Sequence, residues 1–224
     1  MFELPLFPLN TVLFPGIPLA LHIFEDRYKL MIGKCLQERR PFGVVLIRKG
    51  AEALGPLPEP NTIGCTAFIS QVERLHQGRM NIGVIGQRRV RIGSINTDLP
   101  YLRGQVEYYP LREDDLRAQR ELAGRLRPWV ARYLNHLSHL GSKAPRPEDL
   151  PEEPVPLAYA SAALLQIAAS QKQELLSIER AVALLAKLRK VYRSEIAILK
   201  AIGQLPGPEL GEDPNRDQSA FSLN

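Results

Sequence analysis

The sequence is poor in cysteine and histidine, and both shortages narrow the classes of protein to consider. Two cysteines in 224 residues are too few for a disulfide framework, and Cys35 and Cys65 both lie in apolar patterns typical of buried thiols in a reducing compartment. The basic start and unbroken apolar run of a signal peptide are missing. The longest apolar stretch with helical spacing, 157–169, is too short to cross a bilayer. We therefore expect a cytoplasmic protein without a membrane segment.

Motifs for nucleotide hydrolysis and for hydrolytic catalysis are also absent. The sequence contains no G-x-x-x-x-G-K-[ST] loop and no G-x-S-x-G elbow. His136 and His139 have a spacing that could share a metal, but without a nearby cysteine or carboxylate ligand a polar helix face is favoured. For His22, Glu25 and Arg27, a structural hydrogen bond, a helix cap and an ion pair are favoured over acid–base catalysis in a small-molecule hydrolase. We expect no enzyme activity, no cofactor and no metal.

The net charge of +5 is distributed unevenly. Residues 116–203 carry 14 basic and 8 acidic side chains, whereas residues 1–115 carry 14 and 12 and residues 204–224 carry 1 and 4. A basic excess attracts nucleic acid or acidic protein, but here it is spread along the whole helical half. Solvated helix faces are the favoured interpretation.

The amino-terminal half has the pattern of a small β-barrel. Pro5, Pro8, Pro15 and Pro18 each remove a backbone donor and fix φ, so the apolar opening can form only short edge or rim strands broken by turns. An apolar stripe with helical spacing predicts one early helix over 25–38. Further strands are expected at 42–48, 63–75, 80–85, 88–95 and 102–108, with a hairpin turn at 77–79, a strand break at Gly86 and a long loop over 50–60.

Near residue 115 the period of the apolar residues changes from two to about 3.6, which indicates helices. Pro128 is expected either to kink the first of these helices or to begin a second one. A proline-rich connector covers 141–156, and a long final helix ends at Gly203 and Pro206. We predict an α+β fold with a β-barrel domain over 1–115, a helical bundle over 116–203 and a disordered tail over 204–224.

Two groups of side chains are candidates for binding. Phe14, Phe24 and Tyr28, with Arg27 as a polar rim, could form an apolar surface at the barrel opening, although aromatic residues in such positions usually pack inward. The loop over 54–60 is a further candidate for this surface.

The second group consists of Arg88, Arg89 and Arg91, which could contact the phosphates of a nucleic acid. Strand alternation places Arg89 and Arg91 on one face and Arg88 on the other. Because no aromatic stacking platform accompanies them, a solvated strand face is favoured.

Several short motifs, taken in order, resemble the amino-terminal substrate-binding domain of Lon ATP-dependent proteases. The opening ends in Ile-Phe-Glu-Asp-Arg-Tyr at 23–28. Later segments are similar to the V-G-T-x-A, D-G-R…G-x-x-R-[FV], P-Y-[LI], L-P-x-x-P and K-Q-x-L-L motifs of that family, at 63–67, 78–90, 100–102, 150–154 and 172–176.

The resemblance implies a PUA-like β-pseudobarrel followed by a helical bundle. It further implies a stand-alone, non-catalytic module that binds unfolded polypeptides or one protein partner, which could be a separate protease, because neither the motor nor the peptidase of the family follows. RNA binding by a PUA-like barrel is the alternative function, and fold analogy alone does not support it.

Overall fold

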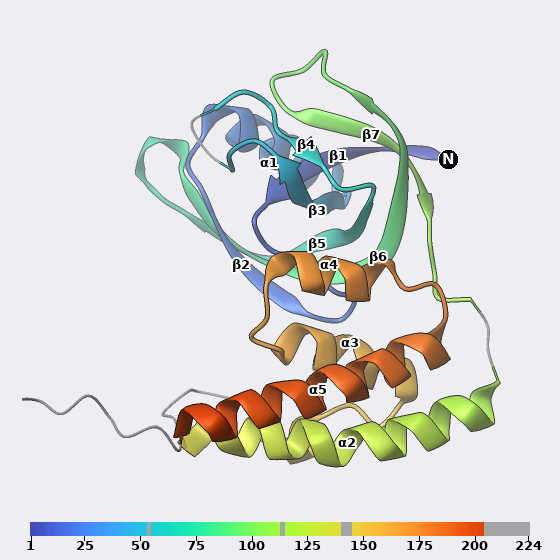
Figure 1. The fold of residues 1–224 in the computed structure, drawn as a ribbon. Coiled ribbons are helices and arrows are strands. Elements are labelled where there is room, and N and C mark those ends of the chain that lie inside the picture. Colours follow the sequence, from blue (N-terminus) through green and yellow to red (C-terminus); the bar gives the residue numbers. More distant parts are fainter. Residues whose placement is uncertain (53–54, 113–114, 140–144, 204–224) are drawn as a thin grey trace, which may run out of the picture.

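A seven-stranded β-sheet lies above a layer of helices in the computed structural model, which describes residues 1–52, 55–112, 115–139 and 145–203 (Figure 1). The strands are β1 (Phe2–Leu9), β2 (Pro18–Ile23), β3 (Phe42–Lys49), β4 (Glu59–Pro60), β5 (Ile63–Arg74), β6 (Met80–Asn96) and β7 (Leu102–Tyr108). The helices are α1 (Asp26–Glu38), α2 (Leu116–His139), α3 (Pro154–Leu164), α4 (Ala169–Ser177) and α5 (Ala181–Gly203), with short 3₁₀ turns at His76–Gly78 and Pro147–Asp149. The predicted α+β class and the early helix are confirmed.

The sheet closes on itself through β1. Its strand order is β1-β7-β6-β5-β3-β4, and β1 also pairs with β3 in parallel, from Leu6 to Leu9. On its other edge β1 pairs with β7, but only from Phe2 to Leu6. Among the described strands, β2 pairs with β6 alone. In the described part of the chain, residues 7–9 of β1 therefore have no strand partner on the edge away from β3, and β2 has none on the edge away from β6.

The predicted strand break at Gly86 is wrong, because β6 runs without interruption from Met80 to Asn96. Its first half pairs with β2 and its second half with β7. Between these halves a bulge places Gln87 and Arg88 opposite Thr66, whose hydroxyl accepts a hydrogen bond from the Arg88 amide at 3.0 Å. Position 86 requires glycine for a different reason. A Cβ atom there would lie 2.2 Å from the carbonyl oxygen of Phe14, so no side chain fits.

The helical layer differs from the sequence prediction at two places. Pro128 lies inside α2, so the alternative in which it begins a second helix is wrong. The apolar stretch 157–169 is not one helix, because α3 ends at Leu164 and α4 begins at Ala169. At this break the amide of Gln166 donates to the hydroxyl of Tyr133 at 3.0 Å. A side chain thus satisfies a donor that would otherwise bond within a continuing helix.

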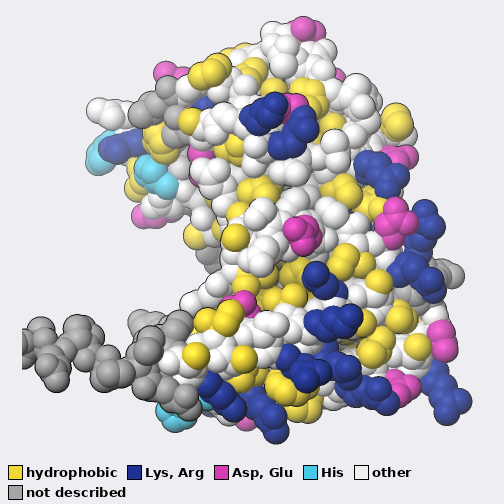
Figure 2. Space-filling view, viewed as in Figure 1, with side chains coloured by type: hydrophobic (Ala, Val, Ile, Leu, Met, Phe, Trp, Pro, Cys, Tyr) yellow, Lys and Arg dark blue, Asp and Glu magenta, His cyan; other side chains and the backbone are white. Residues whose placement is uncertain are grey.

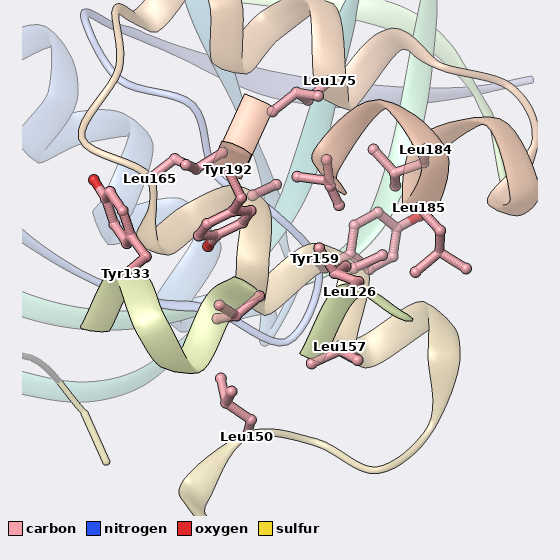
Figure 3. Close-up of a cluster of buried hydrophobic side chains, with 14 of the residues drawn as sticks. Leu126, Tyr133, Leu150, Leu157, Tyr159, Leu165, Leu175, Leu184, Leu185 and Tyr192 are labelled. Carbon is pink, nitrogen blue, oxygen red and sulfur yellow. The ribbon is translucent and has the colours of Figure 1, made fainter. Parts of the chain in front are cut away.

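The largest apolar core lies between the helices (Figure 3). Tyr133 of α2 and Tyr192 of α5 meet edge to face with their ring centroids 5.2 Å apart, and the Tyr192 hydroxyl donates to the carbonyl of Ser161 at 2.7 Å. Phe14, from the connection between β1 and β2, is fully buried in this same core. The barrel and the helices therefore share a core. The domain boundary at 115, next to the start of α2, stays a prediction.

Candidate functional site

The barrel wall is open between the end of β1 and the edge of β2. A cavity of about 300 Å³ fills this gap; we call it the seam cavity, and it is lined by Phe7, Leu9, Ala20–Glu25, Tyr28 and Glu52. Successive strand residues point to opposite faces of a sheet. Because all of Ala20–Glu25 line the cavity, it runs along the edge of β2 and not over one face.

The free edge of β2 presents backbone hydrogen-bonding groups in a known register. The carbonyl of Ile17 accepts a hydrogen bond from the Gly86 amide at 3.0 Å, so Ile17 faces β6. In an antiparallel pair alternate residues face alternate edges, which directs Leu19 and Leu21 toward β6. The amide and carbonyl groups of Ala20 and His22 consequently face the open edge. Pro18, which has no amide proton, also falls in this outward register, where proline is tolerated.

Tyr28 provides a buried polar group in the wall of the seam cavity. Its side chain is 3% exposed, and its ring lies 4.3 Å from that of Phe7. The Tyr28 hydroxyl has no hydrogen-bond partner among the described residues, and burial raises its pKa. A buried hydroxyl usually has a partner. This one is available to donate to, or accept from, a bound molecule.

Phe24 and Arg27 lie at the border of the seam cavity. Phe24 is 43% exposed, and its ring stacks on that of His22 at 5.9 Å. Arg27 forms a mostly buried ion pair with Glu25 at 2.8 Å and donates to the carbonyl of Gly55 at 3.1 Å. It therefore ties the start of α1 to the loop after β3. The expected Glu25–Arg27 ion pair is present, but Glu25, at the N-cap of α1, makes no side-chain capping hydrogen bond.

The remaining apolar candidates fall elsewhere. Phe14 is fully buried, with its ring 6.4 Å from that of Tyr159, so it does not lie on an accessible surface. Within the candidate loop 54–60, residue 54 lies outside the described residues, as does the predicted tail 204–224, while Pro58 and Pro60 are buried. The structure thus brings Phe24 and Tyr28 together, with Arg27 beside them.

Sequence reasoning missed Phe7, Leu9 and Glu52. The first two reach the seam because β1 pairs in parallel with β3, a long-range contact that no local pattern predicts. Pro8 was the available signal, since proline within a strand indicates an edge. Glu52 is held by the amide of Asn10, which donates to its carboxylate at 2.8 Å.

The three candidate arginines do not form a solvated row. The guanidinium carbons of Arg89 and Arg91 lie 4.7 and 3.9 Å from the ring centroid of Tyr109, and Arg88 lies over Tyr108 instead. The alternation is therefore as predicted, but the expected exposure of Arg89 is wrong. This side chain is 2% exposed because β6 meets the helical layer there.

Arg91 is also engaged, because it lies 3.8 Å from Glu107 and 3.6 Å from Glu179. Among the described residues neither Arg88 nor Arg89 forms an ion pair with an acid, and of the three arginines only Arg88 is exposed. Elsewhere, Lys and Arg side chains are spread over the helical layer with apolar side chains between them (Figure 2). This arrangement does not favour a concentrated phosphate-binding surface.

Three other features of the described residues bear on chemistry. No group of three or more His, Cys, Asp or Glu side chains there could hold a metal ion. Cys35 and Cys65 are free and buried, and burial raises the pKa of the first thiol to about 11 and of the second to about 12. Neither is poised as a nucleophile. None of the described helices combines the length and apolar character needed to span a bilayer.

The architecture of a small barrel on a helical bundle is shared with solved Lon amino-terminal domains. The Lon N-terminal domain protein from Xanthomonas campestris superposes with a TM-score of 0.62 at 26% identity, covering 84% of this chain and 97% of that one. The N-terminal domain of the Mycobacterium avium complex Lon protease superposes with a TM-score of 0.65 at 20% identity, covering 86% and 98%, and shows the fold alone.

The family model described as ATP-dependent protease La (LON) substrate-binding domain matches residues 3–191. The chain therefore belongs to the Lon substrate-binding domain family, as its motifs predicted.

Curated relatives include full-length enzymes. The Lon protease of Roseiflexus castenholzii is 33% identical over 104 residues, which cover 46% of this chain and 13% of that protein. The Lon protease of Syntrophus aciditrophicus is 24% identical over 227 residues, or 98% and 28%. A LON peptidase N-terminal domain and RING finger protein of Schizosaccharomyces pombe is 32% identical over 127 residues, or 50% and 26%. This chain thus spans a small part of their length, and the family model that it matches is not that of a catalytic domain.

Proposed function

We propose that this chain is a non-catalytic module that binds extended polypeptides along the free edge of β2. The observation that carries the proposal is the seam cavity itself. There an unpaired strand edge, an apolar wall and the unpartnered hydroxyl of Tyr28 occur together. Membership of a family described as substrate-binding supports the same function.

Strand addition would use the outward groups of Ala20 and His22. An extended peptide beside β2 exchanges backbone hydrogen bonds with these residues, each worth about 0.5–1.5 kcal/mol net. Alternate peptide side chains then point toward the barrel, and a volume of about 300 Å³ holds one large apolar side chain between Phe7, Leu21 and Tyr28. Burial of such a side chain contributes about 1.5–3 kcal/mol.

The partner in this proposal is an unfolded polypeptide or an exposed segment of one protein, and a separate protease could receive it. We place the activity in the cytoplasm, which fits two buried cysteines that are free thiols. No bond is made or broken by this chain in the proposal. The barrel binds the polypeptide, and helices α2–α5 stabilise the barrel through the shared core that includes Phe14.

Fluorescence anisotropy with a labelled extended peptide of alternating apolar and polar residues tests the proposal. Ala20→Pro removes an outward amide proton without removing a bond to β6, and should weaken binding several-fold. Ala20→Val is the matched control, because it keeps the amide and favours the strand, and should bind as the wild-type chain does.

Equal binding by the wild-type chain and Ala20→Pro would contradict strand addition at β2, provided that circular dichroism shows both proteins folded. No binding at micromolar concentration would contradict the proposed function itself. Binding of an RNA oligonucleotide that weakens steeply with salt, without peptide binding, would replace it with the nucleic-acid alternative.

A further inference from the structure

A second cavity, of about 400 Å³, lies where the barrel meets the helices; we call it the junction cavity. Its wall is mostly apolar and comes from the β1–β2 connection, the segment after β7 and helix α3, with Pro15, Leu111, Val155 and Tyr159 among its residues. Arg89 and the exposed Arg88 enter it from β6. It shares no lining residue with the seam cavity.

The guanidinium of Arg89 is buried in this wall without a carboxylate partner among the described residues. The side chain is 2% exposed, and neither Nε, Nη1 nor Nη2 has an acceptor in hydrogen-bond geometry among the described residues. Its contact with the Tyr109 ring, at 4.7 Å, neutralises none of its charge. Burial raises the pKa of the Tyr159 hydroxyl, whereas the charge of Arg89 and a hydrogen-bonding contact with its side chain lower it, so the hydroxyl is the polar group that faces the guanidinium. A buried charge without a partner is costly to fold.

The described acids nearest to Arg89 are already engaged by other groups. Glu179 accepts from the Tyr109 hydroxyl at 2.7 Å and lies 3.0 Å from Arg112 and 3.6 Å from Arg91. Glu107 lies 3.8 Å from Arg91. Arg89 makes no ion pair with either of them within the described part of the chain. The charge of Arg89 helps to lower the pKa of Glu179, but no described carboxylate accepts a hydrogen bond from its guanidinium.

We propose that the junction cavity binds a small organic carboxylate with an apolar or aromatic body. The planar carboxylate would take two parallel hydrogen bonds from the guanidinium of Arg89, a geometry that this fork matches. The apolar body would lie against Tyr108, Val155 and Tyr159. Arg88, whose guanidinium carbon lies 4.9 Å from the Tyr108 ring centroid, would add positive charge at the mouth. This site is independent of polypeptide binding at the seam.

Isothermal titration of the full chain with three probes tests the charge requirement. Benzoate should bind, whereas benzamide, which has the same shape without the charge, and benzylamine, with the opposite charge, should bind at least tenfold more weakly. Inorganic phosphate separates anion attraction from recognition of the apolar body, and should bind more weakly than benzoate. Equal affinity for benzoate and benzamide, or no benzoate binding at millimolar concentration, would overturn the proposal without any variant being made.

Two variants locate the site. Arg89→Met keeps the length of the side chain and removes the unpaired charge, so the variant should be at least as stable as the wild-type chain in urea while losing benzoate binding at least tenfold. Val155→Trp should fill the cavity and weaken benzoate binding with Arg89 in place. Unchanged benzoate affinity in either folded variant would overturn the assignment. Marked destabilisation of Arg89→Met, with no benzoate binding by the wild-type chain, would show that this arginine is structural.

Discussion

The carbonyl oxygen of Phe14 lies in the space that a Cβ atom on Gly86 would occupy, with 2.2 Å between the two positions. Hydrogen bonds fix the approach on both sides, since the Gly16 amide donates to Gly86 at 2.8 Å and the Gly86 amide donates to Ile17 at 3.0 Å. The side chain of Phe14 then enters the core between the helices. One close backbone contact therefore joins the edge strand β2, the long strand β6 and the helical layer.

Gly86→Ala should destabilise the chain by more than about 2 kcal/mol, because the added methyl group meets backbone that cannot rotate away. Urea unfolding followed by circular dichroism measures the change. Gly124→Ala is the control, since this glycine is exposed inside α2 with nothing within 4 Å of an added Cβ. It should stabilise the chain by about 0.5–1 kcal/mol. Equal effects at the two positions would contradict the close approach at Gly86.

Substitution of Phe14 and of Phe24 by alanine should affect stability and peptide binding differently. Phe14→Ala opens a cavity in the helical core and should cost about 3–5 kcal/mol of stability. Phe24→Ala removes a ring that is 43% exposed, and should cost about 0.5 kcal/mol or less while weakening peptide binding several-fold. Urea unfolding of both variants measures the change in stability, and fluorescence anisotropy measures the change in peptide affinity. Full peptide affinity in Phe24→Ala would remove Phe24 from the binding surface.

Tyr192→Phe and Tyr133→Phe should differ in stability. The first leaves the buried carbonyl of Ser161 without its 2.7 Å hydrogen bond, which should cost about 1–3 kcal/mol. The second frees the amide of Gln166, an exposed residue that water can reach, and should cost about 1 kcal/mol or less. Thermal unfolding of both variants compares them, and a larger loss for Tyr133→Phe would contradict the arrangement of the α3–α4 break.

Stability should fall in mildly alkaline solution. Burial raises the pKa of Cys35 to about 11 and of Cys65 to about 12, whereas an unfolded thiol has a pKa of about 8.5. The contribution of each buried thiol is complete below about pH 8.5 and is lost as the pH rises through the folded-state pKa, because only the unfolded chain ionises in that window. For each thiol, the free energy of unfolding should fall by about 1.4 kcal/mol per pH unit once that thiol is fully ionised in the unfolded chain.

Urea unfolding in small steps from pH 8 to pH 9 tests this pH dependence where an unfolded tyrosine, with a pKa of about 10, is still mostly protonated. The double variant Cys35→Ala/Cys65→Ala should be less stable at pH 8 but lose less stability with pH. A slope equal to that of the wild-type chain would show that the thiols are not responsible.

Local sequence patterns predicted the helices and strands but not the long-range contacts between them. The apolar stripe through Tyr28 and Met31 predicted α1, because a helix repeats every 3.6 residues whatever it packs against. Gly86 was read as a strand break because its close approach to Phe14 depends on residues about 70 positions away in sequence. The apolar stretch 157–169 is interrupted where the Gln166 amide donates to the Tyr133 hydroxyl, a long-range contact that apolar spacing cannot reveal.

One wall of the candidate site was predictable from the sequence, and the other was not. The opening motif contained Phe24, Arg27 and Tyr28, and the seam cavity lies beside them. Its other wall depends on where β1 leaves β7 and continues along β3. Arg89 was placed on the correct side of β6, but its burial depends on helices that follow much later in the chain.

Residue-resolved amide exchange of the full chain, with and without a saturating extended peptide, tests strand addition at β2 most directly. The account predicts that the amides of Ala20 and His22, which face the open edge, become protected when the peptide is bound, while those of Leu19 and Leu21 stay as protected as before. Protection confined to residues outside β2 and the seam cavity, or unchanged exchange at Ala20 and His22 with the peptide bound, would contradict it.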